Sequence, residues 1–194
     1  MQFSDLDLTK TYSYADYLSW SFNERLELIK GKIFKMSPAP SRKHQKVSMT
    51  ITREFSSFLK GKRCEVYAAP FDVRMSGQKD ERQIITVLQP DVCVICDPSK
   101  LDDRGCLGAP DIVVEILSPG NNQKELQNKY DVYEEAGVKE YWIIHPDERT
   151  FLRYILSTEN KFIGERLLTI GDFVQTPVLS GFELNLTEVF EGLD

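Results

Sequence analysis

The sequence predicts one domain of mixed α+β type over residues 1–194: a central mixed β-sheet flanked by helices, with an extra β-hairpin towards each terminus. Two runs, 91–96 and 112–117, are almost wholly apolar, which is typical of strands covered on both faces. The run 112–117 is followed by a helical pattern over 121–136 and by a third apolar run over 140–145. This order indicates a right-handed crossover between parallel strands. The length is enough for one domain with a real core and short for two.

Local periodicity and turn residues place the elements. Apolar residues at spacings of three and four, from Val47 to Leu59, predict a helix that begins after the N-cap residue Ser41 and ends at Gly61. Segment 97–108 is expected to be a turn-rich loop. The expected helices cover 11–20, 41–60 and 121–136, and the expected strands lie within 26–36, 64–75, 84–87, 91–96, 112–117, 140–145, 151–155, 162–168 and 173–186.

Composition bounds the class of protein. No apolar run approaches the roughly 20 residues of a membrane-spanning helix, and the N-terminus has no signal-peptide pattern, so we expect a cytoplasmic protein without membrane contact. The four cysteines are then expected to be thiols. Cys93 and Cys96 would point to opposite faces of a strand, so a zinc site is not expected. No Gly-rich phosphate loop and no serine nucleophile elbow is present.

Charge is distributed unevenly. Ten basic residues and one acid lie between Lys30 and Arg63, a local charge of +9 in a chain whose net charge is −6. Such a split can mark a face that meets a polyanion, or a solvated helix face with hairpin lysines. The candidate contacts to nucleic acid, expected to face outward from the helix over 41–60, are Arg42, Lys43, Lys46 and Arg53.

Three carboxylates lie on or beside the two apolar runs. Asp111 and Glu115 are four residues apart on one strand, roughly 13 Å, which is too far to share one Mg²⁺ ion. Asp91 begins a different strand, and neighbouring strands are only about 4.8 Å apart. If the strands pair in register, Asp91 and Glu115 converge. Otherwise Asp91 caps a turn and Glu115 pairs with a lysine.

Helix geometry predicts that Lys129 lies close to Glu115. A helix that starts near Gln123 carries Lys129 roughly 9 Å back along the preceding strand, level with Glu115. Lys129 also flanks an apolar stripe, so its stem can lie on the sheet while the ammonium reaches the carboxylates. The alternative is a surface lysine paired with Glu125, four residues earlier.

Several segments in order resemble a known family. They are Glu27-Leu-Ile-Lys-Gly-Lys-Ile, Met36-Ser-Pro-Ala-Pro-Ser-Arg-Lys-His44-Gln45, Ala69-Pro-Phe-Asp-Val, Gln89-Pro-Asp91, Cys96-Asp-Pro-Ser-Lys-Leu-Asp, Gly108-Ala-Pro-Asp-Ile-Val-Val-Glu115-Ile-Leu-Ser-Pro, and Lys129 through Tyr133 to Ala136-Gly-Val-Lys-Glu-Tyr-Trp142. This series, from about Tyr12 to the C-terminus, resembles the Uma-two family of endonucleases, a branch of the PD-(D/E)xK nuclease superfamily.

The resemblance implies a restriction-endonuclease-like core in which Asp91 and Glu115 bind Mg²⁺ or Mn²⁺. Glu27 matches an additional N-terminal acid of the family, both catalytic and metal-binding. The superfamily lysine normally follows the second acid by two residues, where this chain has Leu117; in this family it is moved to the next helix, which matches Lys129. His44, Gln45 and Tyr133 are auxiliary candidates, although the position of His44 on an apolar helix stripe favours a core histidine.

The implied activity is metal-dependent hydrolysis of phosphodiester bonds in nucleic acid, with DNA as the expected substrate. The implied catalytic residues are Asp91, Glu115, Lys129 and Glu27. An inactive or weakly active nucleic-acid-binding module on the same fold is the alternative. A nuclease for RNA or for branched or damaged DNA would share the same residues. The resemblance is also compatible with a homodimer, because nucleases of this fold often cut two strands as dimers.

Overall fold

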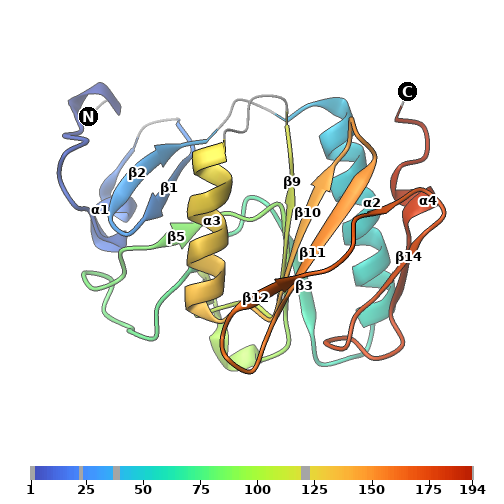
Figure 1. Ribbon diagram of the computed structural model, residues 1–194. Helices are drawn as coiled ribbons and strands as arrows, with labels where there is room; N and C mark the ends of the chain where they lie inside the picture. The colour runs from blue at the N-terminus through green and yellow to red at the C-terminus, as the bar shows by residue number, and fades with distance from the viewer. Residues whose placement is uncertain (1–2, 22–23, 37–39, 119–122, 194) are drawn as a thin grey trace.

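The computed structural model describes residues 3–21, 24–36, 40–118 and 123–193, and it has the predicted mixed α+β fold, with two main sheets (Figure 1). Its helical segments are η1 (Phe3–Asp5), α1 (Tyr14–Ser19), α2 (Arg42–Leu59), η2 (Pro98–Lys100), α3 (Gln123–Ala136) and α4 (Leu186–Val189). Positions 121 and 122 of the helix expected over 121–136 lie outside the described residues.

The larger sheet has the strand order β12-β11-β10-β9-β6-β3, and β13 also pairs with β11. Its strands are β3 (Glu65–Ala68), β6 (Val92–Ile95), β9 (Ile112–Ile116), β10 (Glu140–His145), β11 (Thr150–Leu156), β12 (Phe162–Gly164) and β13 (Leu168–Thr169). β9 and β10 are parallel and joined through α3, whereas the other pairs are antiparallel, so the sheet is mixed.

The second sheet carries the N-terminal hairpin and has the order β2-β1-β5-β4-β8-β7. Its strands are β1 (Leu26–Ile29), β2 (Lys32–Lys35), β4 (Val73–Arg74), β5 (Val87–Leu88), β7 (Leu101–Asp102) and β8 (Gly105–Leu107). A separate two-stranded pair near the C-terminus is formed by β14 (Phe173–Gln175) and β15 (Glu183–Asn185).

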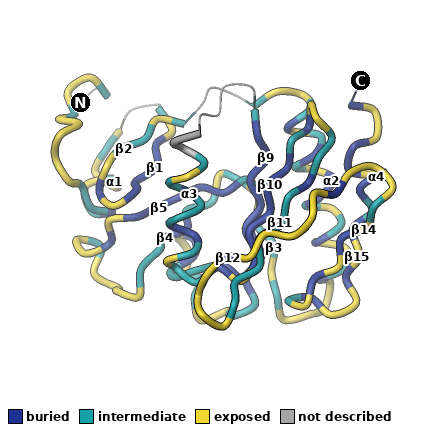
Figure 2. Tube along the Cα trace, in the orientation of Figure 1, coloured by how far each residue is buried: buried dark blue, intermediate teal, exposed yellow. Residues whose placement is uncertain are grey.

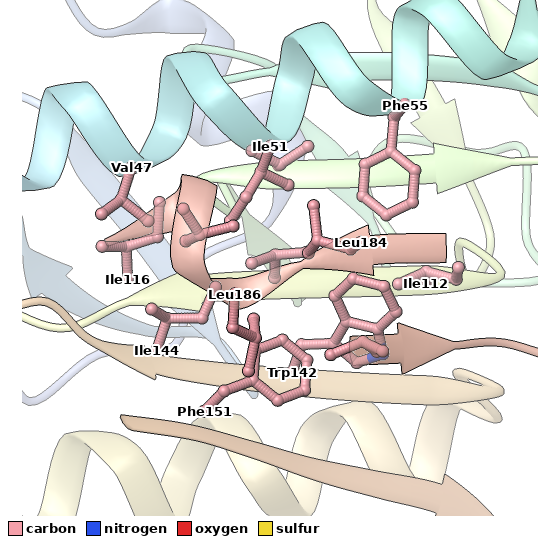
Figure 3. Packing of buried hydrophobic residues seen from close by; sticks show 14 of the residues in the cluster. Val47, Ile51, Phe55, Ile112, Ile116, Trp142, Ile144, Phe151, Leu184 and Leu186 are labelled. Carbon is pink, nitrogen blue, oxygen red and sulfur yellow. The ribbon is translucent and has the colours of Figure 1, made fainter. Parts of the chain in front are cut away.

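The two faces of the larger sheet are buried by different helices. Along β9, Ile112, Val114 and Ile116 pack in the cluster that includes the apolar face of α2 (Figure 3). Val113 and Leu117 pack in the cluster that includes α3. This alternation follows from the period of two in a strand, and Figure 2 shows burial concentrated along β9 and β10. The prediction that the apolar strands are covered on both faces is confirmed.

The ends of α2 are set by residues recognisable in the sequence. The Ser41 hydroxyl accepts a hydrogen bond from the His44 backbone N–H at 3.2 Å, as an N-cap side chain does. At the other end Gly61 has φ +74°, in the left-handed region that favours glycine and stops a helix. The helix therefore begins at a determined position, which sets where His44 lies.

Several predictions about the fold are wrong. The strand expected over 84–87 is seen only at its end, in β5, and the one expected over 162–168 is divided between β12 and β13. Segment 97–108 is not only turns, because it holds η2 and the short strands β7 and β8, which extend the second sheet. Cys64 and Cys96 are joined in a disulfide, whereas Cys93 and Cys106 are free thiols. The pairing of Glu65 with Ile95 on β3 and β6 makes Cys64 and Cys96 the next opposed positions, a register that spacing alone does not reveal.

Within the described ranges, no helix is both long and apolar enough to cross a membrane.

Candidate active site

Asp91 and Glu115 face each other across two paired strands. Val92 pairs with Val114 in the antiparallel register of β6 and β9, so positions 91 and 115 are the next opposed pair. Asp91 Oδ2 also accepts a hydrogen bond from the Ile116 backbone N–H at 2.7 Å. Both carboxylates line one pocket of about 80 Å³. The convergence expected from strand spacing is therefore present.

Lys129 reaches this pair from α3. Glu115 has the same strand parity as Val113 and Leu117, so its side chain is on the face that α3 covers. Lys129 Nζ lies 3.0 Å from Glu115 Oε1, and the Tyr133 hydroxyl donates to the same oxygen at 2.6 Å. Lys129 is only 6% exposed, which excludes the alternative of a surface lysine.

Glu27 comes from the other sheet. It lies on β1, is buried, and its Oε1 is 3.1 Å from Lys129 Nζ and accepts a hydrogen bond from the Gln89 backbone N–H at 2.9 Å. Lys129 is thus held between two carboxylates from two sheets. The site lies where the second sheet meets the end of β9.

Burial and neighbouring charges together set the protonation of these groups. Desolvation raises the pKa of Glu115 to about 7, opposed by the Lys129 ammonium and supported by Asp91 and Glu27. Burial by itself would lower the pKa of Lys129, but Glu115 and Glu27 outweigh it and hold that pKa well above its usual value. Burial and the Glu115 carboxylate hold the pKa of Tyr133 well above its usual value too. Lys129 is therefore a cation at neutral pH.

The raised pKa of Glu115 has a measurable effect on stability. Between its ordinary value of 4.5 and about 7, the folded chain binds a proton at Glu115 that the unfolded chain does not. In metal-free buffer this contribution to the free energy of unfolding is present below about pH 4.5. It is lost as the pH rises through about 7, by at most about 1.4 kcal/mol per pH unit. Glutamine is neutral at every pH, so the Glu115→Gln variant should lack this pH dependence, as urea unfolding in EDTA between about pH 5 and pH 8 would show. Parallel pH profiles for the two proteins would contradict this.

The auxiliary candidates separate in space. His44, from α2, is buried, and its Nε2 lies 3.2 Å from Asp91 Oδ1. It is therefore a core histidine that also contacts a residue of the site. Its Nδ1 is buried and has no hydrogen-bond partner among the described residues. Gln45 is exposed and is not among the residues that line the pocket. Tyr133 contacts Glu115 from within the core.

Asp111 is separate from this group, as expected. Its carboxylate is buried at the start of β9, where Oδ1 lies 2.6 Å from Lys139 Nζ and Oδ2 accepts from the Cys96 backbone N–H at 2.7 Å. Its charge is balanced locally by Lys139.

The basic residues of α2 are not among those that line the pocket. Arg42 and Arg53 are exposed, as expected, whereas Lys43 and Lys46 are half-buried. Lys43 pairs with Asp147 at 3.0 Å and Arg53 with Glu54 at 2.8 Å. The N-terminal part of the helix, which also carries His44, is nearest to Asp91.

Gln89 and Arg25 were not assigned from the sequence, and both line the pocket. The Gln89 side chain accepts from Arg25 Nη2 at 2.8 Å and donates to Asp72 Oδ1 at 2.8 Å. Gln89 stands in the Gln-Pro-Asp segment, so its proximity to Asp91 was a usable signal. Arg25 had none, because its contact with Gln89 spans 64 positions.

The chemistry of the side chains fits a divalent cation. The pocket is lined by three carboxylates (Glu27, Asp91, Glu115) against two cations, Lys129 and the exposed Arg25. No three His, Cys, Asp or Glu side chains of the described residues are close enough to hold a metal ion by themselves. Mg²⁺ needs fewer, because it keeps several waters and is often bound through one or two carboxylates.

Comparison with known proteins identifies the family of the chain. The model of the Uma2 family, described as "Putative restriction endonuclease", matches residues 14–187. An uncharacterized protein from Synechocystis sp. is 27% identical over 123 residues; the alignment covers 62% of this chain and 61% of that relative's length.

A crystal structure from Anabaena variabilis, described as a putative nuclease belonging to DUF820, superposes with a TM-score of 0.75. The match covers 94% of this chain and 99% of that one at 22% identity, which supports the fold. The family match covers most of the chain and includes all the acids of the pocket together with Lys129, and on that basis the protein belongs to the Uma2 family of restriction-endonuclease-like proteins.

Proposed function

We propose that the chain is a metal-dependent endonuclease that hydrolyses phosphodiester bonds in nucleic acid, with DNA as the first candidate. The observation that carries this proposal is the meeting of Asp91, Glu115 and a buried, charged Lys129 in one pocket. Structural ion pairs are usually balanced, whereas this pocket has an excess of carboxylates beside an opening to solvent. Such a site favours a cation and a polyanionic ligand together.

Asp91, Glu115 and the Ile116 carbonyl are the proposed ligands of Mg²⁺ or Mn²⁺. The Ile116 N–H faces Asp91, and the carbonyl of a strand residue leaves the same edge as its N–H, so this carbonyl is directed towards Asp91. When bound, the cation supplies polarisation of a phosphodiester oxygen and a lower pKa for a bound water. The Glu27 carboxylate already contacts Lys129. We therefore propose that Glu27 holds a second metal ion, or a hydrated ion, through a water molecule.

Lys129 acts as a charged donor. Because its pKa is held well above the usual value, it does not release a proton at neutral pH and is not a general base in this state. Its ammonium instead orients the attacking water and offsets the negative charge that develops on the phosphoryl oxygens. Glu27 and Glu115 keep the ammonium in place from two sides.

The substrate backbone would approach over α2. Arg42, Lys43 and Lys46 belong to the first turns of the helix that brings His44 to Asp91, and Arg53 lies further along it. Basic side chains on one helix contact successive phosphates and make affinity depend steeply on salt. In this proposal the phosphates lie along α2, and the helix leads them towards His44 and Asp91, despite the net charge of −6.

Plasmid cleavage and calorimetry test the proposal together. The purified chain should nick or linearise supercoiled plasmid with Mg²⁺ or Mn²⁺, and EDTA should abolish cutting. Titration calorimetry should detect Mg²⁺ or Mn²⁺ binding that is weaker in the Asp91→Asn and Glu115→Gln variants. If no binding depends on these two residues and no nucleic acid is cut, the chain is a non-catalytic module on a nuclease fold.

A further inference from the structure

A second hollow adjoins the carboxylate pocket. It measures about 390 Å³, lies between α3 and the strands β10 and β11, and is lined by Leu126, Tyr130, His145, Leu152 and Tyr154 among others. The Tyr130 and Tyr154 rings meet edge to face, with centroids 5.1 Å apart. All five side chains are half-buried, so apolar and aromatic surface reaches solvent here. The function proposed above does not use this groove.

The groove is continuous with the candidate active site. Leu117, directly after β9, and Leu126, on the second turn of α3, line both the groove and the carboxylate pocket. No Asp or Glu lines the groove among the described residues, whereas three line the pocket. A ligand that extends from the pocket into the groove therefore meets aromatic and apolar side chains and no carboxylate of the described residues.

The two sides of the pocket differ in chemistry. On one side lie Arg25, which lines the pocket, and the first turn of α2, whose His44 contacts Asp91; on the other, α3 and β11 offer tyrosines and leucines. Phosphates suit the first side and a flat apolar ring suits the second. A nucleotide carries both parts, and its phosphodiester is the group that the carboxylate pocket is proposed to act on.

We propose that this groove takes an unstacked nucleobase beside the scissile phosphate, so that the substrate is a single strand or a locally opened duplex. This inference rests on the proposed endonuclease function and narrows its substrate. In an intact duplex every base is stacked and paired, so its face cannot enter a side groove without being extruded. The groove volume is within the range of roughly 300–1,000 Å³ usual for small-ligand sites.

Binding to labelled oligonucleotides tests the groove without relying on cleavage. Fluorescence anisotropy would measure the Kd for a short single strand, a blunt duplex of the same sequence, and a strand with abasic positions, with Ca²⁺ in place of the activating metal and the strands checked to be intact. The wild-type chain should prefer the single strand. Tyr130→Leu keeps an apolar groove but removes the ring, and should weaken single-strand binding by about 5- to 150-fold.

Two variants keep this test interpretable. Tyr130→Phe retains the ring and should bind within about threefold of the wild type, since stacking does not need the hydroxyl. Tyr67→Leu removes a half-buried tyrosine on β3, at the opposite edge of the sheet, and should leave binding unchanged. Thermal unfolding of each variant checks that a loss of binding is not a loss of folding.

Four results would overturn the inference. They are equal affinity of Tyr130→Leu and the wild type, equal affinity for abasic and intact strands, tighter binding of the blunt duplex, and a Tyr130→Leu effect on self-association in place of nucleic-acid binding. Each leaves the endonuclease proposal standing if plasmid is still cut. A wild-type chain that binds neither strand nor duplex would overturn both proposals.

Discussion

Replacing Lys129 with Met is expected to lower the rate of metal-dependent plasmid cleavage by about 100- to 1,000-fold, the usual effect of removing one preorganised hydrogen-bond donor from a reaction centre. Lys129 is the buried cation between Glu27 and Glu115. Methionine has nearly the same length and packs in the same space, so the change removes charge with little change in volume. The measurement is the initial rate of nicking at saturating Mg²⁺ or Mn²⁺.

The same variant is expected to be less stable. Breaking a buried pair leaves an uncompensated charge, which typically costs about 3–5 kcal/mol, so the cleavage rates must be compared well below the melting temperature of the variant. Lys30→Met is the matched control, because Lys30 pairs with Glu135 at the surface, where both partners are more than half exposed. That pair should matter little to stability and not at all to cleavage. If the wild type and Lys129→Met cut plasmid at the same rate, Lys129 is not the charged donor of the reaction.

Asp91→Asn is expected to weaken Mg²⁺ binding at least about tenfold and to abolish cleavage at moderate metal concentrations. Asparagine retains an oxygen that accepts from the Ile116 N–H and so retains the local geometry, but it lacks the charge that attracts the cation. Calorimetry with Mg²⁺ or Mn²⁺ measures the affinity directly, and raising the metal concentration should partly restore cutting.

Asp111→Asn is the matched control for this experiment. Both aspartates follow a proline and both accept a backbone hydrogen bond, but Asp111 is balanced by Lys139 at the other end of β9. Its replacement is expected to change stability and leave Mg²⁺ affinity as it was. If the two variants bound metal equally, the distinction between the two Pro-Asp segments would be wrong.

Some of the site follows from local geometry alone. Residues four apart on a strand cannot share an ion, which separates Asp111 from Glu115 without any knowledge of the fold. The rise per residue of a helix and of a strand places Lys129 level with Glu115, and the observed 3.0 Å contact agrees. These predictions were possible because strand and helix periods are constant, and because the strand and helix are consecutive in the chain.

Other parts of the site depend on chain segments far apart in sequence. The contacts of Glu27 with Lys129 and of Arg25 with Gln89 require the second sheet to pack at the end of β9. The disulfide between Cys64 and Cys96 requires the register of β3 and β6, and the groove of Tyr130 and Tyr154 requires α3 to lie over β11. Amphipathic patterns show that a face is buried but do not name its partner.

The amino-acid order alone was sufficient for the mixed α+β class, the helix that begins after Ser41, and the separation of Asp111 from Glu115, because these depend on short-range periodicity. For Asp91, Glu115 and Lys129 it allowed one site but left alternatives open, and only the family resemblance favoured their grouping. Tertiary packing decided that His44 contacts Asp91, that Lys129 lies between two acids, and that an aromatic groove continues the pocket. Those contacts join segments whose separation in sequence carries no information about their distance in space, so only the folded chain determines them.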